Sequence, residues 1–130
     1  MESLVEGDLI YLLNERGVWI NDTSTWRKGY RGGENYEFGI IAHNGQEIVI
    51  VEVKTTLRVG QVEAFIERFK KAKGYMPEYE ARTVLGAITC LRAEEASDQH
   101  AQNQGLFVIR AIGDSAFIVN PEGFQPHKFG

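Results

Sequence analysis

A carboxylate and an ammonium group stand two positions apart at Glu52 and Lys54. Residues at this spacing point to the same face of a β-strand, and the run before them, Ile48–Val51, is apolar. Charged side chains rarely border a core unless they are paired or hold a metal ion. A carboxylate can bind a hard cation such as Mg²⁺ with substrate phosphate, and a neighbouring lysine can orient or deprotonate a water molecule. A simple charge pair at a solvated strand end would give the same pattern.

A β-hairpin is expected to position this pair. Two β-rich runs, 36–42 and 46–54, flank Asn44-Gly45, a strong signal for a tight turn. If these two residues form the whole turn, the ladder puts Glu37 opposite Glu52. Like charges facing each other destabilise a sheet, except at a solvated edge, where a cation bridges them, or where one is protonated. Glu37 is therefore a candidate second metal ligand beside Glu52.

Hydrophobic periodicity and turn residues predict the remaining elements. The expected order is α-β-β-β-α-β-α-β-β, with a polar, Gly-rich connection over 21–35. A strand–helix–strand crossover after Glu52 implies parallel strands, so we expect an α/β fold with a mixed β-sheet flanked by helices on both faces. The expected helices span 2–15, 59–74 and 93–104, and the expected strands span 18–20, 36–42, 46–54, 83–91, 106–110 and 116–119.

Composition suits one domain spanning 1–130, with 43% hydrophobic and 25% charged residues. No apolar run is long enough for a membrane span, and the N-terminus does not resemble a signal peptide. The single cysteine, Cys90, is expected to be a core thiol in a cytoplasmic protein. The apolar segment Phe117–Val119 could form a homodimer edge or simply belong to the core. The net charge of −4 argues against a general nucleic-acid coat but is compatible with local basic patches that hold phosphate.

The segment 26–33 combines cations, aromatic rings and glycines, and we expect it to be a loop near Glu52. Arg27, Lys28, Tyr30 and Arg31 could hold a phosphate backbone and stack a base. A solvated connecting loop without any function fits the composition equally well.

The run IVIVEVKTT at 48–56, preceded by a hairpin and followed by an amphipathic helix, resembles the PD-(D/E)xK nuclease superfamily. It is similar to restriction-endonuclease-like proteins and Holliday-junction resolvases, and Gly105–Phe124 is similar to an uncharacterised prokaryotic branch. The resemblance implies a restriction-endonuclease-like fold and Mg²⁺- or Mn²⁺-dependent hydrolysis of DNA. It also implies catalytic roles for Glu52, Lys54 and Glu6, and makes Gln61 a candidate near the substrate.

Gly39 departs from the pattern of this superfamily. Members of this kind usually carry Glu-aromatic-Asp-aliphatic before the hairpin, whereas this chain reads Glu37-Phe38-Gly39-Ile40. Glycine supplies no ligand and weakens a strand interior, so folding does not explain it. Three explanations stay open: a natural inactive variant, an inactivating change in this chain, or transfer of the ligand role to Glu37.

The sequence therefore leaves three functional hypotheses. The first is a Mg²⁺-dependent DNA endonuclease, impaired by Gly39. The second is a catalytically inactive nuclease-like module that binds DNA or protein. The third is a structural or oligomerisation domain in which Glu52 and Lys54 form a buried ion pair.

Overall fold

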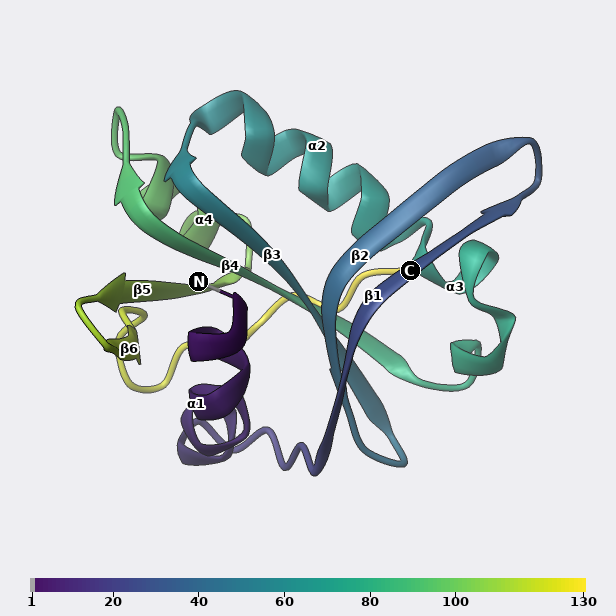
Figure 1. Cartoon of the computed structure of the whole chain (residues 1–130), viewed down its shortest axis with the longest axis horizontal. Coiled ribbons are helices and arrows are strands. Elements are labelled where there is room, and N and C mark those ends of the chain that lie inside the picture. The colour runs from purple at the N-terminus through teal and green to yellow at the C-terminus, as the bar shows by residue number, and fades with distance from the viewer. Residues whose placement is uncertain (1) are drawn as a thin grey trace.

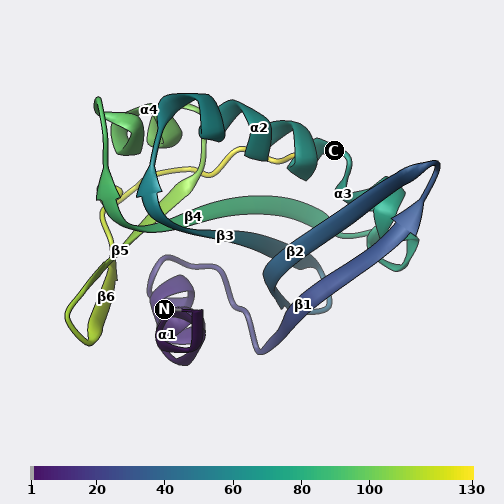
Figure 2. The ribbon, with the colours of Figure 1, turned by 45° about the horizontal axis from the view of Figure 1, so that its top comes forward.

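The computed structural model describes residues 2–130, with side chains described from residue 7 onward. Six strands form one mixed sheet in the order β1-β2-β3-β4-β5-β6. Helix α1 covers one face, whereas α2 and α4 cover the other (Figures 1 and 2). The elements are α1 (Glu2–Glu15), β1 (Asp22–Arg31), β2 (Glu34–His43), β3 (Glu47–Leu57), α2 (Val59–Lys70), α3 (Ala72–Tyr75), a 3-10 turn (Pro77–Tyr79), β4 (Thr83–Ala93), α4 (Ser97–Asn103), β5 (Phe107–Ile112) and β6 (Ser115–Ile118).

The predicted order of elements is confirmed, but the first strand lies elsewhere in the sequence. Residues 18–20 form no strand; Val18 and Ile20 instead pack their side chains into the core on the α1 side. Strand β1 occupies 22–31, inside the segment expected to be a connection. It forms an edge of the sheet, pairs antiparallel with β2 and is largely exposed, so it lacks the apolar alternation that marks a buried strand. The expected loop at 26–33 is therefore wrong for 26–31, which belong to β1, and only Gly32 and Gly33 form a turn.

Two helix boundaries also differ from the prediction. Helix α2 ends at Lys70, and the short α3 follows it after one residue. Helix α4 begins at Ser97, because Ala93 still belongs to β4 and the positive φ angles of Glu95 and Ala96 interrupt the chain.

The hairpin between β2 and β3 has a different register from the expected one. The oxygen of the Asn44 side chain accepts hydrogen bonds from the backbone N–H groups of Gln46 and Glu47, each at 2.7 Å. The connection is therefore longer than two residues, and His43 pairs with Ile48. The predicted pairing of Glu37 with Glu52 is wrong, because the register is shifted by two residues.

Strand β3 is buried on both faces, as its apolar run predicted. Ile48 and Ile50 belong to the core under α2 and α4, whereas Val49 and Val51 belong to the core under α1. Strands β3, β4 and β5 are parallel, which confirms the expected crossover.

Helix α2 lies very close to the sheet. At Gly86 of β4, a Cβ atom would come within 2.7 Å of both the Phe69 ring and the Leu106 side chain, so a larger residue would require these side chains to shift. This contact fixes the height of α2 above the strands. It therefore also fixes the position of Arg68, the residue before Phe69.

Candidate functional site

The candidate site lies where β2 and β3 separate. Their ladder ends at the pair Ile40–Val51, after which β2 continues beside β1 and diverges from β3 (Figure 1). Extending the register by one step places Gly39 opposite Glu52. We call this region the strand fork; it encloses a small cavity of about 280 Å³, lined by Trp26, Glu37, Gly39, Glu52, Val53 and Arg68.

Glu52 is buried at the base of the strand fork, and its partner is Arg68 of α2. Glu52 is 8% exposed, and its Oε1 lies 3.0 Å from Arg68 Nη2. The same Nη2 donates a hydrogen bond to the carbonyl oxygen of Glu37. Oε1 itself has no hydrogen-bond partner among the described residues, so the contact with Arg68 is an ion pair without hydrogen-bond geometry. The guanidinium also lies over the Phe38 ring, 5.4 Å from its centroid.

Sequence reasoning missed Arg68. A signal exists, because Arg68 follows the buried Phe65 by three residues and directly precedes the buried Phe69. A cation at the border of the apolar face of α2 is placed to reach the strand beneath. Its partner could not be inferred from α2 alone.

Burial raises the pKa of the Glu52 carboxyl group above its ordinary value. The positive charges of Arg68 and Lys54 oppose this effect, and the carboxylate of Glu37 adds to it. The raised pKa means that the folded protein holds the Glu52 proton more tightly than an unfolded chain does. Glu52 is thus a buried acid whose negative charge is only partly compensated by its surroundings.

Glu52→Gln is expected to change how stability depends on pH. The stabilisation that Glu52 gives relative to glutamine is largest below the unfolded glutamate pKa of about 4.3 and is lost as pH rises through the higher folded pKa. The difference in melting temperature, wild type minus Glu52→Gln, should therefore fall as the pH rises above the unfolded glutamate pKa. In a chain that keeps Glu52, Arg68→Gln should make the melting temperature fall further with rising pH. The reason is that the substitution removes a positive charge that lowers the pKa of Glu52. A difference that grows with rising pH would contradict the raised pKa.

Lys54 lies on the same face as Glu52, as its spacing predicted. Its Nζ is 5.7 Å from the centroid of the Phe65 ring, so the half-buried ammonium lies between the sheet and α2. Its charge acts on Glu52, although no direct ion pair joins the two. The arrangement gives the strand fork two cations, Lys54 and Arg68, around one buried carboxylate.

Among its described side chains, the strand fork offers only one buried carboxylate, which is fewer oxygen ligands than a divalent metal ion requires. Gly39 offers no oxygen from a side chain, Glu37 is exposed and does not face Glu52 across the ladder, and Arg68 already supplies a positive charge at Glu52. Among the side chains described from residue 7 onward, no group of three or more His, Cys, Asp or Glu residues is placed to hold a metal ion. Mg²⁺ and Mn²⁺ normally require several oxygen ligands.

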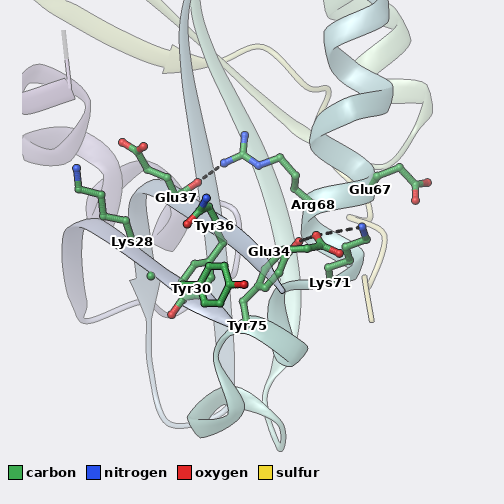
Figure 3. A pocket seen from close by; sticks show the side chains of 11 residues that line it. Lys28, Tyr30, Glu34, Tyr36, Glu37, Glu67, Arg68, Lys71 and Tyr75 are labelled. Carbon is green, nitrogen blue, oxygen red and sulfur yellow. Dashed lines mark hydrogen bonds and ion pairs between the residues drawn. The ribbon is translucent and has the colours of Figure 1, made fainter. Parts of the chain in front are cut away.

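A larger cleft of about 820 Å³ adjoins the strand fork, with which it shares Glu37 and Arg68. Figure 3 shows its lining, in which β1 contributes Lys28 and Tyr30, β2 contributes Glu34 and Tyr36, and the helical side contributes Lys71. Tyr30 is 70% exposed, and Lys28 is exposed as well. Two of the predicted substrate-binding residues, Lys28 and Tyr30, therefore do line a cleft.

Arg27 and Arg31, the other two residues predicted to bind substrate in this segment, have partners within the protein. Arg27 forms an ion pair of 2.6 Å with Glu78, and Arg31 donates to the carbonyl oxygen of Tyr75 at 3.1 Å. Trp26 lies between Thr25 and Arg27, which pair with Ile40 and Phe38 of β2, so the register places it opposite Gly39. The φ of Trp26 is positive, at 55°. This conformation is rare for a large side chain, and such strain often accompanies functional sites.

Gln61 and Glu6 were predicted from the resemblance. Gln61 lies in the first turn of α2, where its Oε1 accepts the backbone N–H of Arg58 at 3.0 Å and so caps the helix. The side chain of Glu6 lies outside the described residues. The described part of α1 packs through Leu9 and Leu13 on the sheet face opposite Arg68.

The fold and this site define a mixed α/β domain with a buried acid–arginine pair at a strand fork. Residues 31–117 match the family described as a domain of unknown function, DUF8196, and the chain belongs to this family. No curated protein matches the sequence. Among the described residues, no helix combines the length and apolar character needed to cross a membrane.

Three solved structures are similar to the chain, each at 16% sequence identity. A protein of unknown function, AF1548, matches over 83% of this chain and 57% of its own, with a TM-score of 0.56. A repair endonuclease from Pyrococcus abyssi matches over 85% and 47%, with a TM-score of 0.48. EndoMS in complex with double-stranded DNA matches over 85% and 45%, with a TM-score of 0.46. The chain spans only about half the length of these proteins, and the likeness concerns the fold alone.

Proposed function

We propose that this chain binds nucleic acid at the strand fork and does not hydrolyse it. The observation that carries the proposal is the ion pair between Glu52 and Arg68, in a cavity that a glycine also lines at position 39. In a PD-(D/E)xK site, which the sequence resembles, a divalent ion would be expected here. Arg68 instead supplies a permanent positive charge whose planar N–H groups match phosphate oxygens.

Nucleic acid is supported by the groups around the strand fork and the adjoining cleft. Lys28 and Lys54 bring two further cations, and Trp26 and Tyr30 are 58% and 70% exposed. Aromatic side chains beside cations suit stacking of bases next to a phosphate backbone. Because the whole chain carries a net charge of −4, binding is expected to be local and sensitive to salt.

A Mg²⁺-dependent DNA endonuclease is the second candidate, and one observation favours it. Glu52 and Lys54 share a face, and position 39 lines the same cavity as Glu52. Compared with the PD-(D/E)xK pattern, this chain is therefore missing only one carboxylate, the one expected at position 39. On this alternative, hydrolysis by the present chain would be weak and would depend on Glu37.

Binding of the full chain to duplex DNA, measured with EDTA and with Mg²⁺ at low and moderate salt, tests the proposal. We expect equal binding in EDTA and Mg²⁺, weaker binding at the higher salt concentration and no cleaved product. Cleavage that disappears in EDTA would favour the endonuclease. Absence of any salt-sensitive binding would favour a structural domain and overturn the proposal.

A further inference from the structure

A second group of cations lies away from the strand fork, at the carboxyl ends of the parallel strands. Arg58 follows β3, Arg92 lies at the end of β4, and Arg110 lies in β5. Together with Thr56, Ala93 and Glu94 they line a cavity of about 450 Å³. Ligands of parallel α/β sheets commonly bind at the carboxyl ends of the strands.

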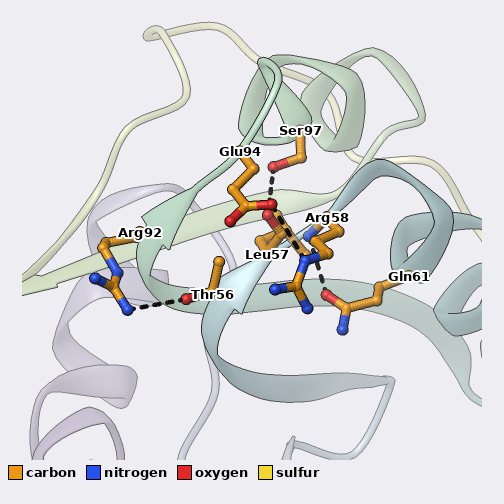
Figure 4. Close-up of polar contacts among 7 residues, drawn as sticks. All are labelled: Thr56, Leu57, Arg58, Gln61, Arg92, Glu94 and Ser97. Atoms are coloured by element: carbon orange, nitrogen blue, oxygen red, sulfur yellow. Dashed lines mark hydrogen bonds and ion pairs between the residues drawn. The ribbon is translucent and has the colours of Figure 1, made fainter.

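The backbone holds this cavity in shape. The carbonyl oxygen of Leu57 accepts hydrogen bonds from the backbone N–H of Glu94 at 2.9 Å and from the hydroxyl group of Ser97 at 3.0 Å. These contacts tie the end of β3 to the turn before α4 (Figure 4). They also bring Glu94 to Arg58, with Oε2 and Nε 3.2 Å apart.

The three guanidinium groups have few partners among the described residues. Arg92 donates only to Thr56 Oγ1, at 3.3 Å, and Figure 4 shows Arg58 and Arg92 on either side of Thr56. Arg110 donates to the carbonyl oxygen of Leu91 at 3.0 Å, and its Nη1 is 3.8 Å from Asp98. A guanidinium carries five N–H donors, so most of them have no acceptor among the residues that the structure describes.

The charges around this cavity favour an anion. Among the described side chains, three arginines face two carboxylates, those of Glu94 and Asp98, which leaves a surplus of one positive charge. Helix α2 begins beside Arg58 and has no acidic residue in its first turn, so its positive end adds to this surplus. Arginine side chains bind phosphate in a bidentate manner that a lysine cannot match.

We propose that Arg58, Arg92 and Arg110 form a binding site for a phosphoryl group, with the hydroxyl group of Thr56 as an additional donor. The site is separate from the strand fork, so it does not require the function proposed above. The phosphoryl group could come from a nucleic-acid backbone or from a free nucleotide, because both present the same oxygens to the arginines.

Titration of the full chain with inorganic phosphate, followed by the NMR signals of the Thr56 amide and the arginine side chains, tests this site. At roughly 0.15 M ionic strength held constant with chloride, we expect saturable shifts at Thr56, Arg92 and Arg110. Arg92→Gln should weaken binding on the order of tenfold. Arg92→Lys should lose part of the affinity although it keeps the charge. Arg82→Gln, which removes a guanidinium at the opposite end of β4, should leave the phosphate affinity unchanged.

Two further arms identify the source of the phosphoryl group. Saturation by a nucleoside diphosphate alone indicates a free nucleotide. Loss of duplex-DNA affinity in Arg92→Gln, without saturation by the nucleotide, indicates a nucleic-acid backbone. Shifts that are absent, or that are spread over the surface and persist in folded Arg92→Gln and Arg110→Gln variants, would overturn the proposal.

Discussion

Replacing Gly39 by aspartate and Arg68 by glutamine together is expected to create a divalent-cation site at Glu52. Gly39 and Glu52 line the same small cavity, one step beyond the last pair of the β2–β3 ladder, so a carboxylate at position 39 would lie close to that of Glu52. Two carboxylates this close repel each other and favour a bridging cation. Removing the guanidinium frees Glu52 Oε1, which now lies 3.0 Å from Arg68 Nη2.

The double variant should bind Mn²⁺ on the order of tenfold or more tightly than either single variant, a difference of at least about 1.4 kcal/mol. Calorimetry measures the affinity, and a rise in melting temperature on adding Mn²⁺ confirms binding to the folded state. Gly39→Asn with Arg68→Gln is the matched control, because asparagine has the shape of aspartate without its charge. A folded double variant that binds no Mn²⁺ would show that position 39 does not face Glu52.

The same double variant also tests the endonuclease alternative. If DNA cleavage appears with Mn²⁺, adding Lys54→Ala should remove the cleavage and leave Mn²⁺ binding in place, because Lys54 holds no metal. Cleavage that survives Lys54→Ala would contradict the role implied by the resemblance. Cleavage by the unaltered chain that is lost in Glu37→Gln would instead support transfer of the ligand role to Glu37.

Reversing two cations of the cleft, Lys28→Glu with Lys71→Glu, is expected to weaken DNA binding strongly. Both residues line the cleft beside Arg68, and both are exposed. Each lost phosphate contact should reduce the slope of log affinity against log salt concentration by roughly one. The slope for the double variant should therefore be smaller by about two. We expect affinity to fall on the order of tenfold to hundredfold at moderate salt.

A matched control separates local contacts from net charge. Lys70→Glu with Lys128→Glu also changes the net charge from −4 to −8, since each reversal subtracts two, but neither residue lines this cleft. Lys71 is ion-paired with Glu34 at 3.5 Å on the surface, and its loss should cost little stability. Equal weakening by both double variants would mean that DNA senses only the overall charge.

Much of the framework could be predicted from the sequence, because local patterns determine it. The φ of Gly17 is 81°, and the N–H of Val18 bonds to the carbonyl oxygen of Leu13, so glycine ends α1 as predicted. The apolar run of β3 predicted burial on both faces, and its alternation placed Glu52 and Lys54 on one face. Cys90 is buried, as expected.

The remaining features depend on contacts that local patterns do not encode. The Asn44 side chain lengthens the hairpin turn, and this shift moves Gly39 rather than Glu37 opposite Glu52. The polar residues of β1 resemble a loop, because an edge strand needs no apolar alternation. The partnership of Arg68 with Glu52 arises only when α2 packs on the sheet.

We propose that the charge of Arg68 takes the place of a divalent ion at Glu52. The most direct measurement is an NMR titration of the unaltered chain with Mn²⁺, which broadens the signals of amides near a bound ion. We expect no saturable broadening at Gly39, Glu52 or Val53. Broadening that is centred on these three amides and saturates with Mn²⁺ would contradict the claim and restore a metal-dependent site.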